Sequence, residues 1–471
     1  MLRRIILVLN GLFRRARTPP ARSADEARRP GFQSFDESTQ GLDTLMPFLR
    51  SPVTLSCPRM VLLCRDFEPP LAEGAGVFEI VSESEFRFRM TGRPVDVGHS
   101  LSALTRSRSD SYNVLSMFRL LLTDAGGREW NAGWVELEAD LEGEDWIFTG
   151  TSDGLITGGQ VVSPKDSSAE ARFLIPRNFS ASIALRRFVQ TAGDGAEPLP
   201  IRTIEVLGQT VTFRFDTEAN MLSISTPHSP ALPAHASENW LGEPLRILFG
   251  QLVFPRLVER RVADGTSMLW VRRSPAWTLD SAWTGLWVGD LRFADDERFF
   301  TLYGNLLTLI AQGTGFESHT VTSFYEEVIQ AARGSRWVWA LTLASSIEGL
   351  VRILSPRGSL RADADQAAID AMRTYISAFH GSSRLRDRAM EVVGRADEIS
   401  PERALRDLAR DGVGTLDQVA SWRSVRGRVM HGEFIPAYST EEDDRTILNM
   451  AELLRALAIE AARRAAAAAG A

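Results

Sequence analysis

The sequence predicts an α+β protein, with a β-rich, sandwich-like domain followed by an all-α helical bundle at the C-terminus. Between about residues 77 and 226 apolar and polar residues alternate with a period of two, which is typical of half-buried strands. After about residue 320 apolar residues recur every three or four positions, as they do along an amphipathic helix. The chain has 471 residues, 44% of them hydrophobic, which is enough for two or three domains.

Residues 1–45 are expected to form a flexible or amphipathic N-terminal arm. The chain begins MLRRIILVLNGLFRRAR, whose apolar run of about seven to nine residues is much shorter than the roughly 20 that span a bilayer. It also lacks the small-residue cleavage site of a secretory signal. Residues 14–45 then mix charge, proline and serine without apolar periodicity. We therefore predict no membrane span and a cytoplasmic location.

Residues 46–315 are predicted to form the β-rich domain, with a helical insertion over 238–261. Glu136, Glu138 and Asp140 alternate along one strand, so we interpret them as its solvated face rather than as a hydrolase site. The predicted strands are contained in 77–90, 130–141, 145–151, 204–216, 217–226 and 268–273.

Charge and cysteine content exclude several classes of protein. The net charge of -7 argues against binding nucleic acid by bulk attraction, which is built on many lysine and arginine contacts to phosphates. The stretch from Arg333 to His431 is different, because its 16 arginines and 12 acidic residues give a charge of about +4. Cys57 and Cys64 are the two cysteines, and no histidine lies near enough to complete a metal site. We expect buried thiols, no metal and no cofactor.

Residues 320–471 are predicted to form the helical domain. The first helix, ALTLASSIEGLVRIL, carries one apolar stripe made of Ala340, Leu343, Ala344, Ile347, Leu350, Val351 and Leu354. Further helices are expected over 366–380, 383–396, 400–412, 415–432 and from about 441 past 460.

Capping signals place the starts of two of these helices. Ser400 has the side chain of an N-cap and Pro401 suits the first helical position. Thr415 and Gln418 have the spacing of a capping box. The last helix is expected to bury its apolar side, which comprises Leu448, Ala451, Leu454, Leu457 and Ala458.

The segment RGRVMHG at 426–432 carries the chemistry of greatest interest. A histidine moves protons near neutral pH, and an arginine provides a permanent, planar cation for phosphate. Together they suffice to help an RNA 2′-hydroxyl attack the adjacent phosphate. Five residues along an ideal helix turn the side chains of Arg426 and His431 about 140° apart. A complete site is therefore more plausible where two such helices meet.

This motif resembles the Arg-x(4)-His-Gly signature of HEPN domains, helical bundles many of which are RNA-cutting toxins or defence effectors. A β-rich domain before such a bundle resembles the ApeA group of HEPN proteins, associated with bacterial defence against phage. The resemblance implies an endoribonuclease that needs no metal, with Arg426 and His431 as catalytic residues and RNA as substrate. It also implies a homodimer or larger even assembly through the helical domain. The β-rich domain is then expected to sense a trigger, such as a phage-derived protein, or to restrain activity.

Three further residues are candidates for supporting roles in this site. Glu348 lies on the first helix, where HEPN proteins sometimes place an acid close to the cleft. Arg428 lies within the motif. Gly427 departs from the family pattern, which usually has a polar residue after the arginine.

Structural interpretations of the same residues stay open at this point. Arg426 can pair with an acid such as Glu433, and His431 can act as a cation at the negative end of the helix dipole. Trp422 is expected in the core, and Glu348 is expected to be solvated or salt-bridged. The alternative function is a non-catalytic HEPN-type binding or scaffold protein, which Gly427 favours.

Overall fold

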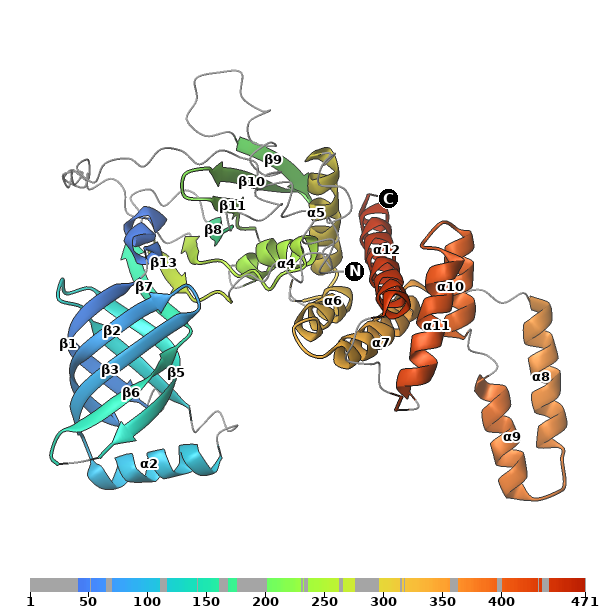
Figure 1. The fold of residues 1–471 in the computed structure, drawn as a ribbon, viewed down its shortest axis with the longest axis horizontal. Coiled ribbons are helices and arrows are strands. Elements are labelled where there is room, and N and C mark those ends of the chain that lie inside the picture. Colours follow the sequence, from blue (N-terminus) through green and yellow to red (C-terminus); the bar gives the residue numbers. More distant parts are fainter. Residues whose placement is uncertain are drawn as a thin grey trace.

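The computed structural model shows a β-rich N-terminal part and a helical C-terminal part (Figure 1). The described residues are 41–50, 52–64, 70–110, 117–141, 143–160, 168–175, 201–229, 232, 236–261, 266–275, 296–313, 316, 318–355, 363–395, 400–430, 432–433 and 440–470. Residues 1–40 of the N-terminal arm, which was expected over 1–45, lie outside them.

Six antiparallel strands form a closed barrel in the first part of the chain. The barrel closes because β4 pairs with both β1 and β5. The strands are β1 (Val53–Leu63), β2 (Ala72–Ser82), β3 (Glu85–Pro94), β4 (Phe118–Thr123), β5 (Glu129–Asp140) and β6 (Trp146–Ser152). Their order around the barrel is β4-β1-β2-β3-β6-β5. The expected sandwich is therefore a closed barrel, which has no free edge. The alternation of apolar and polar residues predicts which side chains face inward, but it does not predict how the strands pair to close the sheet.

A second group of strands continues from the barrel. They run in the order β7-β13-β12-β8-β11-β10-β9, so strands late in the sequence lie between early ones. These strands are β7 (Gly154–Gln160), β8 (Ser168–Leu174), β9 (Ile201–Val206), β10 (Gln209–Asp216), β11 (Met221–Pro227), β12 (Leu257–Arg261) and β13 (Thr266–Arg272). Each expected strand region contains observed strands, which confirms the β-rich prediction.

Several helices of the C-terminal half pack against the last and longest one, α12 (Glu441–Ala469). It contacts helices from both ends of this half of the chain (Figure 1). The other helices are α5 (Asp296–Ala311), α6 (Thr320–Ala331), α7 (Arg336–Leu354), α8 (Asp363–Ser377), α9 (Ser383–Arg395), α10 (Pro401–Arg410) and α11 (Leu416–Met430). The apolar stripe expected on α7 is buried along its whole length. Ser400 caps α10 and Pro401 opens it, as expected.

Apolar packing forms two separate cores. One lies inside the barrel and extends to Leu257, Leu269 and Val271 of β12 and β13. The other joins the strands β8 to β11 to α4 (Ser237–Phe249) and to most of the C-terminal helices. The second core therefore continues across residue 320, where the sequence pattern changes from strands to helices.

Four local expectations differ from the structure. The arm boundary at residue 45 is too late, because η1 (Leu42–Leu49) packs Leu42 and Leu45 into the barrel core. The helix expected over 238–261 ends at Gly250, whose left-handed backbone stops α4 before strand β12. Leu448 is exposed, because α12 turns Ile447 and Met450 toward the core instead. Helix α2 (Val97–Ser109) was not anticipated, since few of its residues are apolar and buried.

Among the described helices, α7 is long and apolar enough to cross a membrane by length and composition. Core helices of soluble proteins pass the same test, and α7 packs against α6, α11 and α12.

Candidate functional site

Helix α11 holds the RGRVMHG motif in a fixed position. Its first turn is closed by the expected capping box, in which the backbone N–H groups of Thr415 and Gln418 donate to each other's side chains at 2.9 and 3.3 Å. Trp422 is buried, as expected, and its indole N–H donates to the Ala344 carbonyl of α7 at 3.0 Å. The direction in which Arg426 leaves α11 is therefore set by the packing of α11 on α7.

Arg426 of α11 is partly exposed and contacts Glu348 of α7. Its Nε donates to Oε2 of Glu348 at 2.8 Å, and 39% of the arginine side chain remains exposed. The guanidinium carbon lies 5.5 Å from the centre of the Trp422 ring, within the range of a cation–π contact. The pairing of Arg426 with Glu433, which was considered from the sequence, is wrong. The acid that contacts Arg426 is Glu348, on the neighbouring helix α7.

Glu348 is held between two arginines. Arg352, one turn further along α7, donates to Oε1 at 2.8 Å while Arg426 occupies Oε2. Partial burial acts to raise the pKa of Glu348, but the hydrogen bonds and charges of both arginines outweigh it and hold this pKa below its ordinary value. Glu348 is therefore ionised at neutral pH and acts as an acceptor that orients Arg426. Its expected salt-bridged state is confirmed.

The supporting role of Arg352 was not recognised from the sequence. The signal that could have shown it is the spacing of four residues from Glu348, with the acid on the N-terminal side, which favours an ion pair on a helix. The pair between Glu348 and Arg426 has no such signal, because 78 residues separate the two.

Arg428 points away from this contact. Its guanidinium nitrogens lie 3.8 Å from Glu433 and 3.7 Å from Asp443. Gly427 is exposed, and a side chain added there would meet nothing within 4 Å. The structure thus brings Glu348 together with Arg426, but it places Arg428 in a different set of ion pairs.

Helix α11 ends at a glycine, as its sequence predicts. Gly432 has a φ of 77°, and the N–H groups of Gly432 and Glu433 donate to the carbonyls of Val429 and Arg428. This is the hydrogen bonding of a glycine-terminated helix. His431 lies outside the described residues.

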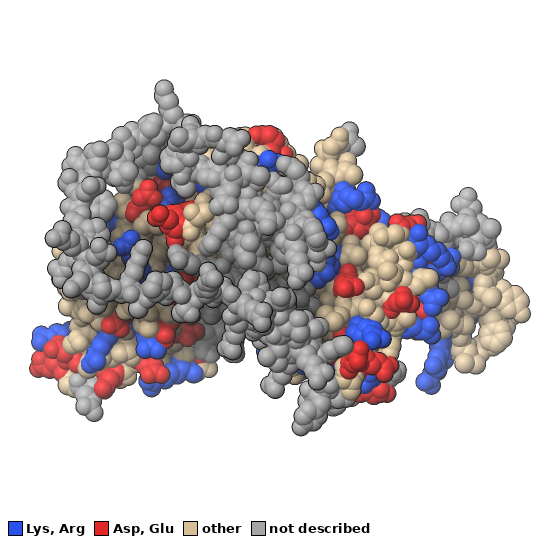
Figure 2. Space-filling view, turned by 45° about the horizontal axis from the view of Figure 1, so that its top comes forward, with Lys and Arg blue, Asp and Glu red and all other residues tan. Residues whose placement is uncertain are grey.

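A groove of about 420 Å³ lies between α10 and α11, and its lining on α11 ends at Ser424, before the motif begins. Leu416, Val419 and Ala420 contribute apolar surface, and Glu402, Arg406 and Arg423 contribute charge. On the face shown in Figure 2, basic and acidic side chains are interspersed over the helical part. That distribution suits local recognition of an anion better than bulk attraction.

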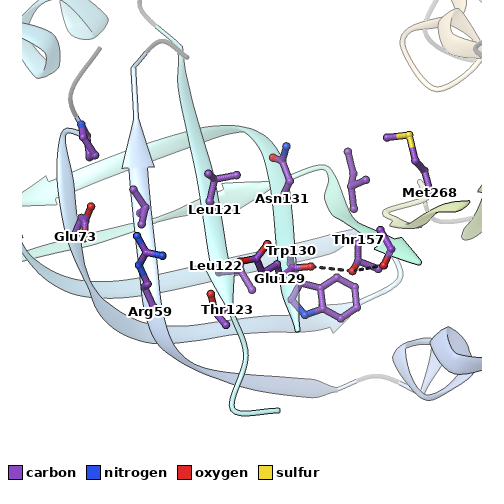
Figure 3. A pocket seen from close by; sticks show the side chains of 14 residues that line it. Arg59, Glu73, Leu121, Leu122, Thr123, Glu129, Trp130, Asn131, Thr157 and Met268 are labelled. Atoms are coloured by element: carbon purple, nitrogen blue, oxygen red, sulfur yellow. Dashed lines mark hydrogen bonds between the residues drawn. The ribbon is translucent and has the colours of Figure 1, made fainter. Parts of the chain in front are cut away.

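A second pocket, of about 470 Å³, lies on the barrel and not near Arg426 (Figure 3). Leu121 and Met268 contribute apolar surface, and Arg59, Glu73 and Glu129 contribute charge. The pocket also reaches β7, whose Thr157 hydroxyl donates to the Glu129 carbonyl at 2.8 Å. This mixture can bind a small molecule or a peptide side chain.

The remaining candidates from the sequence are structural. Glu136, Glu138 and Asp140 are exposed along β5, as expected for a solvated face. Cys57 and Cys64 are buried, and burial raises the pKa of Cys57 to about 11. Among the described ranges, no three or more His, Cys, Asp or Glu residues are grouped as a metal site would need.

Comparison with known proteins found no matching family model, no similar curated protein and no similar solved structure. The HEPN resemblance therefore remains a prediction that depends on the motif and its helical setting.

Proposed function

We propose that this protein is a metal-independent, HEPN-type endoribonuclease of a bacterial defence system. The observation that carries the proposal is the Arg426 side chain, which is partly exposed and oriented by Glu348 on the helix that leads directly to His431. An arginine and a histidine, here five residues apart in the sequence, are the pair of groups that cleavage by the 2′-hydroxyl requires.

In the proposed reaction, the RNA 2′-hydroxyl attacks the adjacent phosphorus, the bond to the 5′-oxygen breaks, and a 2′,3′-cyclic phosphate forms. His431 transfers a proton in this step. Arg426 binds the phosphorane oxygens, whose negative charge increases in the transition state. No described acceptor other than Glu348 takes a hydrogen bond from Arg426, and this contact uses Nε. The terminal nitrogens can therefore face the phosphate.

We further propose that the protein acts in the cytoplasm as a homodimer or larger even assembly. Five residues along an ideal helix place two side chains about 140° apart, so Arg426 and His431 of a single copy would not form a complete site. In this proposal the β-rich half is the sensor, and a phage-derived protein is its trigger. The barrel pocket gives that half a surface at which binding can occur.

The test is RNA cleavage by the purified full-length chain. His431→Ala and Arg426→Ala are each expected to reduce kcat by about 10²–10⁴-fold, because each removes a group that acts on the reacting phosphate. The double variant is expected to be scarcely slower than either single one, since residues of one catalytic unit are not additive. EDTA should leave cleavage intact, and the products should end in 2′,3′-cyclic phosphate.

Arg445→Ala is the matched control, because Arg445 is a helical arginine with 71% of its side chain exposed, and it pairs with Glu441 of its own helix. It should keep full activity. Retention of cleavage by both motif variants, together with a lower melting temperature, would show that the pair is structural.

Two observations favour the alternative, a non-catalytic binding or scaffold protein. Arg426 is already ion-paired with Glu348, and Gly427 offers no side chain where HEPN nucleases usually have a polar one. Gly427→Asn separates the two functions. It should raise a weak cleavage activity if the protein is a nuclease, and it should produce none if the protein is a scaffold.

A further inference from the structure

Helices α8 and α9 form a hairpin that stands clear of the rest of the helical part (Figure 1). The two helices pack against each other, for example where the Ser377 hydroxyl meets the Met390 sulfur at 4.0 Å. None of the described side chains of either helix is buried. We call this segment, residues 363–395, the arm; it is distinct from the N-terminal arm expected over residues 1–45.

The arm carries large apolar side chains that nothing in this chain covers among the described residues. Their exposed fractions run from 49% to 76%, although the sequence gives both helices an apolar side. These residues are Met372, Tyr375, Phe379, Leu385 and Val392. Isolated helices of 13 to 15 residues are marginal in water, and most helical stability in proteins comes from covering such a side. An uncovered side of this kind marks an interaction surface.

The two helices of the arm carry opposite charge. Helix α8 contains three aspartates and one arginine, so its net charge is -2. Helix α9 contains four arginines, one aspartate and one glutamate, so its net charge is +2. A second arm related by a two-fold axis can therefore place its α9 against α8 and its α8 against α9, with attraction at both contacts.

We propose that the arm of one copy packs against the arm of a second copy, so that the two hairpins form an intermolecular four-helix bundle. Two helical hairpins, each with exposed apolar side chains on both of its helices, can combine into such a bundle. The five exposed side chains offer on the order of 500 Å² per arm, since an aromatic side chain alone covers about 150–250 Å². Two arms together bury about 1,000 Å², the area at which a specific interface begins.

The charge of the arm favours a second copy of this chain over RNA as its binding partner. The arm has no net charge, because the -2 of α8 and the +2 of α9 cancel. Surfaces that bind RNA are built on an excess of lysine and arginine. The inference deepens the proposed function, because it names the element that would hold the proposed dimer together. Dimerisation and RNA cleavage are measured separately, so the two can fail separately.

The experiment measures the mass of the full-length chain by light scattering and analytical ultracentrifugation across a concentration series. The natural sequence is expected to form a dimer. Tyr375→Glu and Leu385→Glu each place a charge in the apolar side of the arm and are expected to weaken the dimer roughly 30-fold or more, the usual effect of losing a central interface residue. Leu448→Glu is the matched control, because Leu448 is 40% exposed on α12 rather than on the arm. It should leave the dimer unchanged.

Backbone hydrogen exchange provides a second measurement. Residues 363–395 should exchange slowly at concentrations where the dimer forms and quickly below its dissociation constant, while α7 and α12 stay protected in both conditions. A monomer at 50 µM overturns the proposal, as does a dimer that the two arm variants leave intact. A monomer whose arm is protected only by added RNA would assign the arm to RNA instead.

Discussion

At the scale of single residues, one contact gives the candidate site its geometry. The carboxylate of Glu348 accepts hydrogen bonds from Arg426 and Arg352 and thereby fixes the guanidinium of Arg426 beside Trp422. A free arginine side chain would lose roughly 2 kcal/mol of rotamer entropy on meeting a phosphate. An arginine already held by Glu348 loses less, and this would be the physical advantage of the pair in the proposed nuclease.

Glu348→Gln tests this positioning role. We expect kcat for RNA cleavage to fall by about 10–100-fold with little change in KM, because the arginine remains present but is less well oriented. A purely structural role would change stability and leave the kcat of the folded fraction unaltered. The substitution should also change the pH dependence of stability, which is measured as the melting temperature between pH 3 and pH 7.

The direction of that pH effect follows from the pKa of Glu348. Because the two arginines lower this pKa in the folded state, the contribution of Glu348 to stability is complete above the ordinary value of 4.5 and is lost as the pH falls through the lower folded value. The difference in melting temperature between the natural protein and Glu348→Gln should therefore shrink below about pH 4.5. A difference that grows in acid would contradict the ion pair.

At the scale of elements, two glycines in the helices of the site have opposite environments. A Cβ at Gly349 of α7 would lie 2.5 Å from ring carbons of Phe324 in α6. This glycine lets α6 and α7 approach closely, and that approach fixes the face of α7 that presents Glu348. A Cβ at Gly427 of α11 would meet nothing within 4 Å.

The two glycine-to-alanine variants should change stability in opposite directions. Gly349→Ala is expected to destabilise the protein by about 1–3 kcal/mol, because the ring of Phe324 must shift. Gly427→Ala is expected to stabilise it by about 0.5–1 kcal/mol, because alanine is the better helix former and has room. Chemical denaturation of both variants gives the comparison. Equal stabilisation by both would show that α6 and α7 are not in close contact at Gly349.

At the scale of the whole molecule, the two cores are joined by a continuous ladder of strands and by one buried arginine. The ladder passes from the barrel through β7, β13 and β12 to β8. Arg256 is buried between the two parts, and its guanidinium donates to the carbonyls of Glu83, in the β2–β3 turn, and Arg272 of β13. In the proposed function, a signal bound at the barrel would have this route toward the helical part.

Because the cores are separate, we expect two unfolding transitions in guanidinium. Phe148→Ala should lower the stability of the barrel transition by about 3–5 kcal/mol and leave the other unchanged. Leu457→Ala, in α12, should lower the stability of the helical transition by about 2–5 kcal/mol. Both side chains are fully buried, one in each core. A single transition that both variants shift would mean that the strand ladder couples the cores into one unit.

Features that depend on near neighbours along the chain could be predicted from the amino-acid sequence. The strand regions, the starts of α10 and α11, the glycine end of α11 and the buried stripe of α7 could all be predicted, because periodicity and capping act within a few residues. The core position of Trp422 followed from the same pattern. Arg426 could be singled out by its motif and Glu348 by the family resemblance, but the contact between them could not be predicted.

Only the tertiary structure decided the features that depend on residues far apart. The strand pairing that closes the barrel, the packing of η1 into it and the contact between Glu348 and Arg426 all join distant segments. A local pattern shows which face of an element is apolar but not which other element covers it. The uncovered side of the arm has the same origin, since its sequence is that of an ordinary amphipathic hairpin and only the fold leaves it exposed.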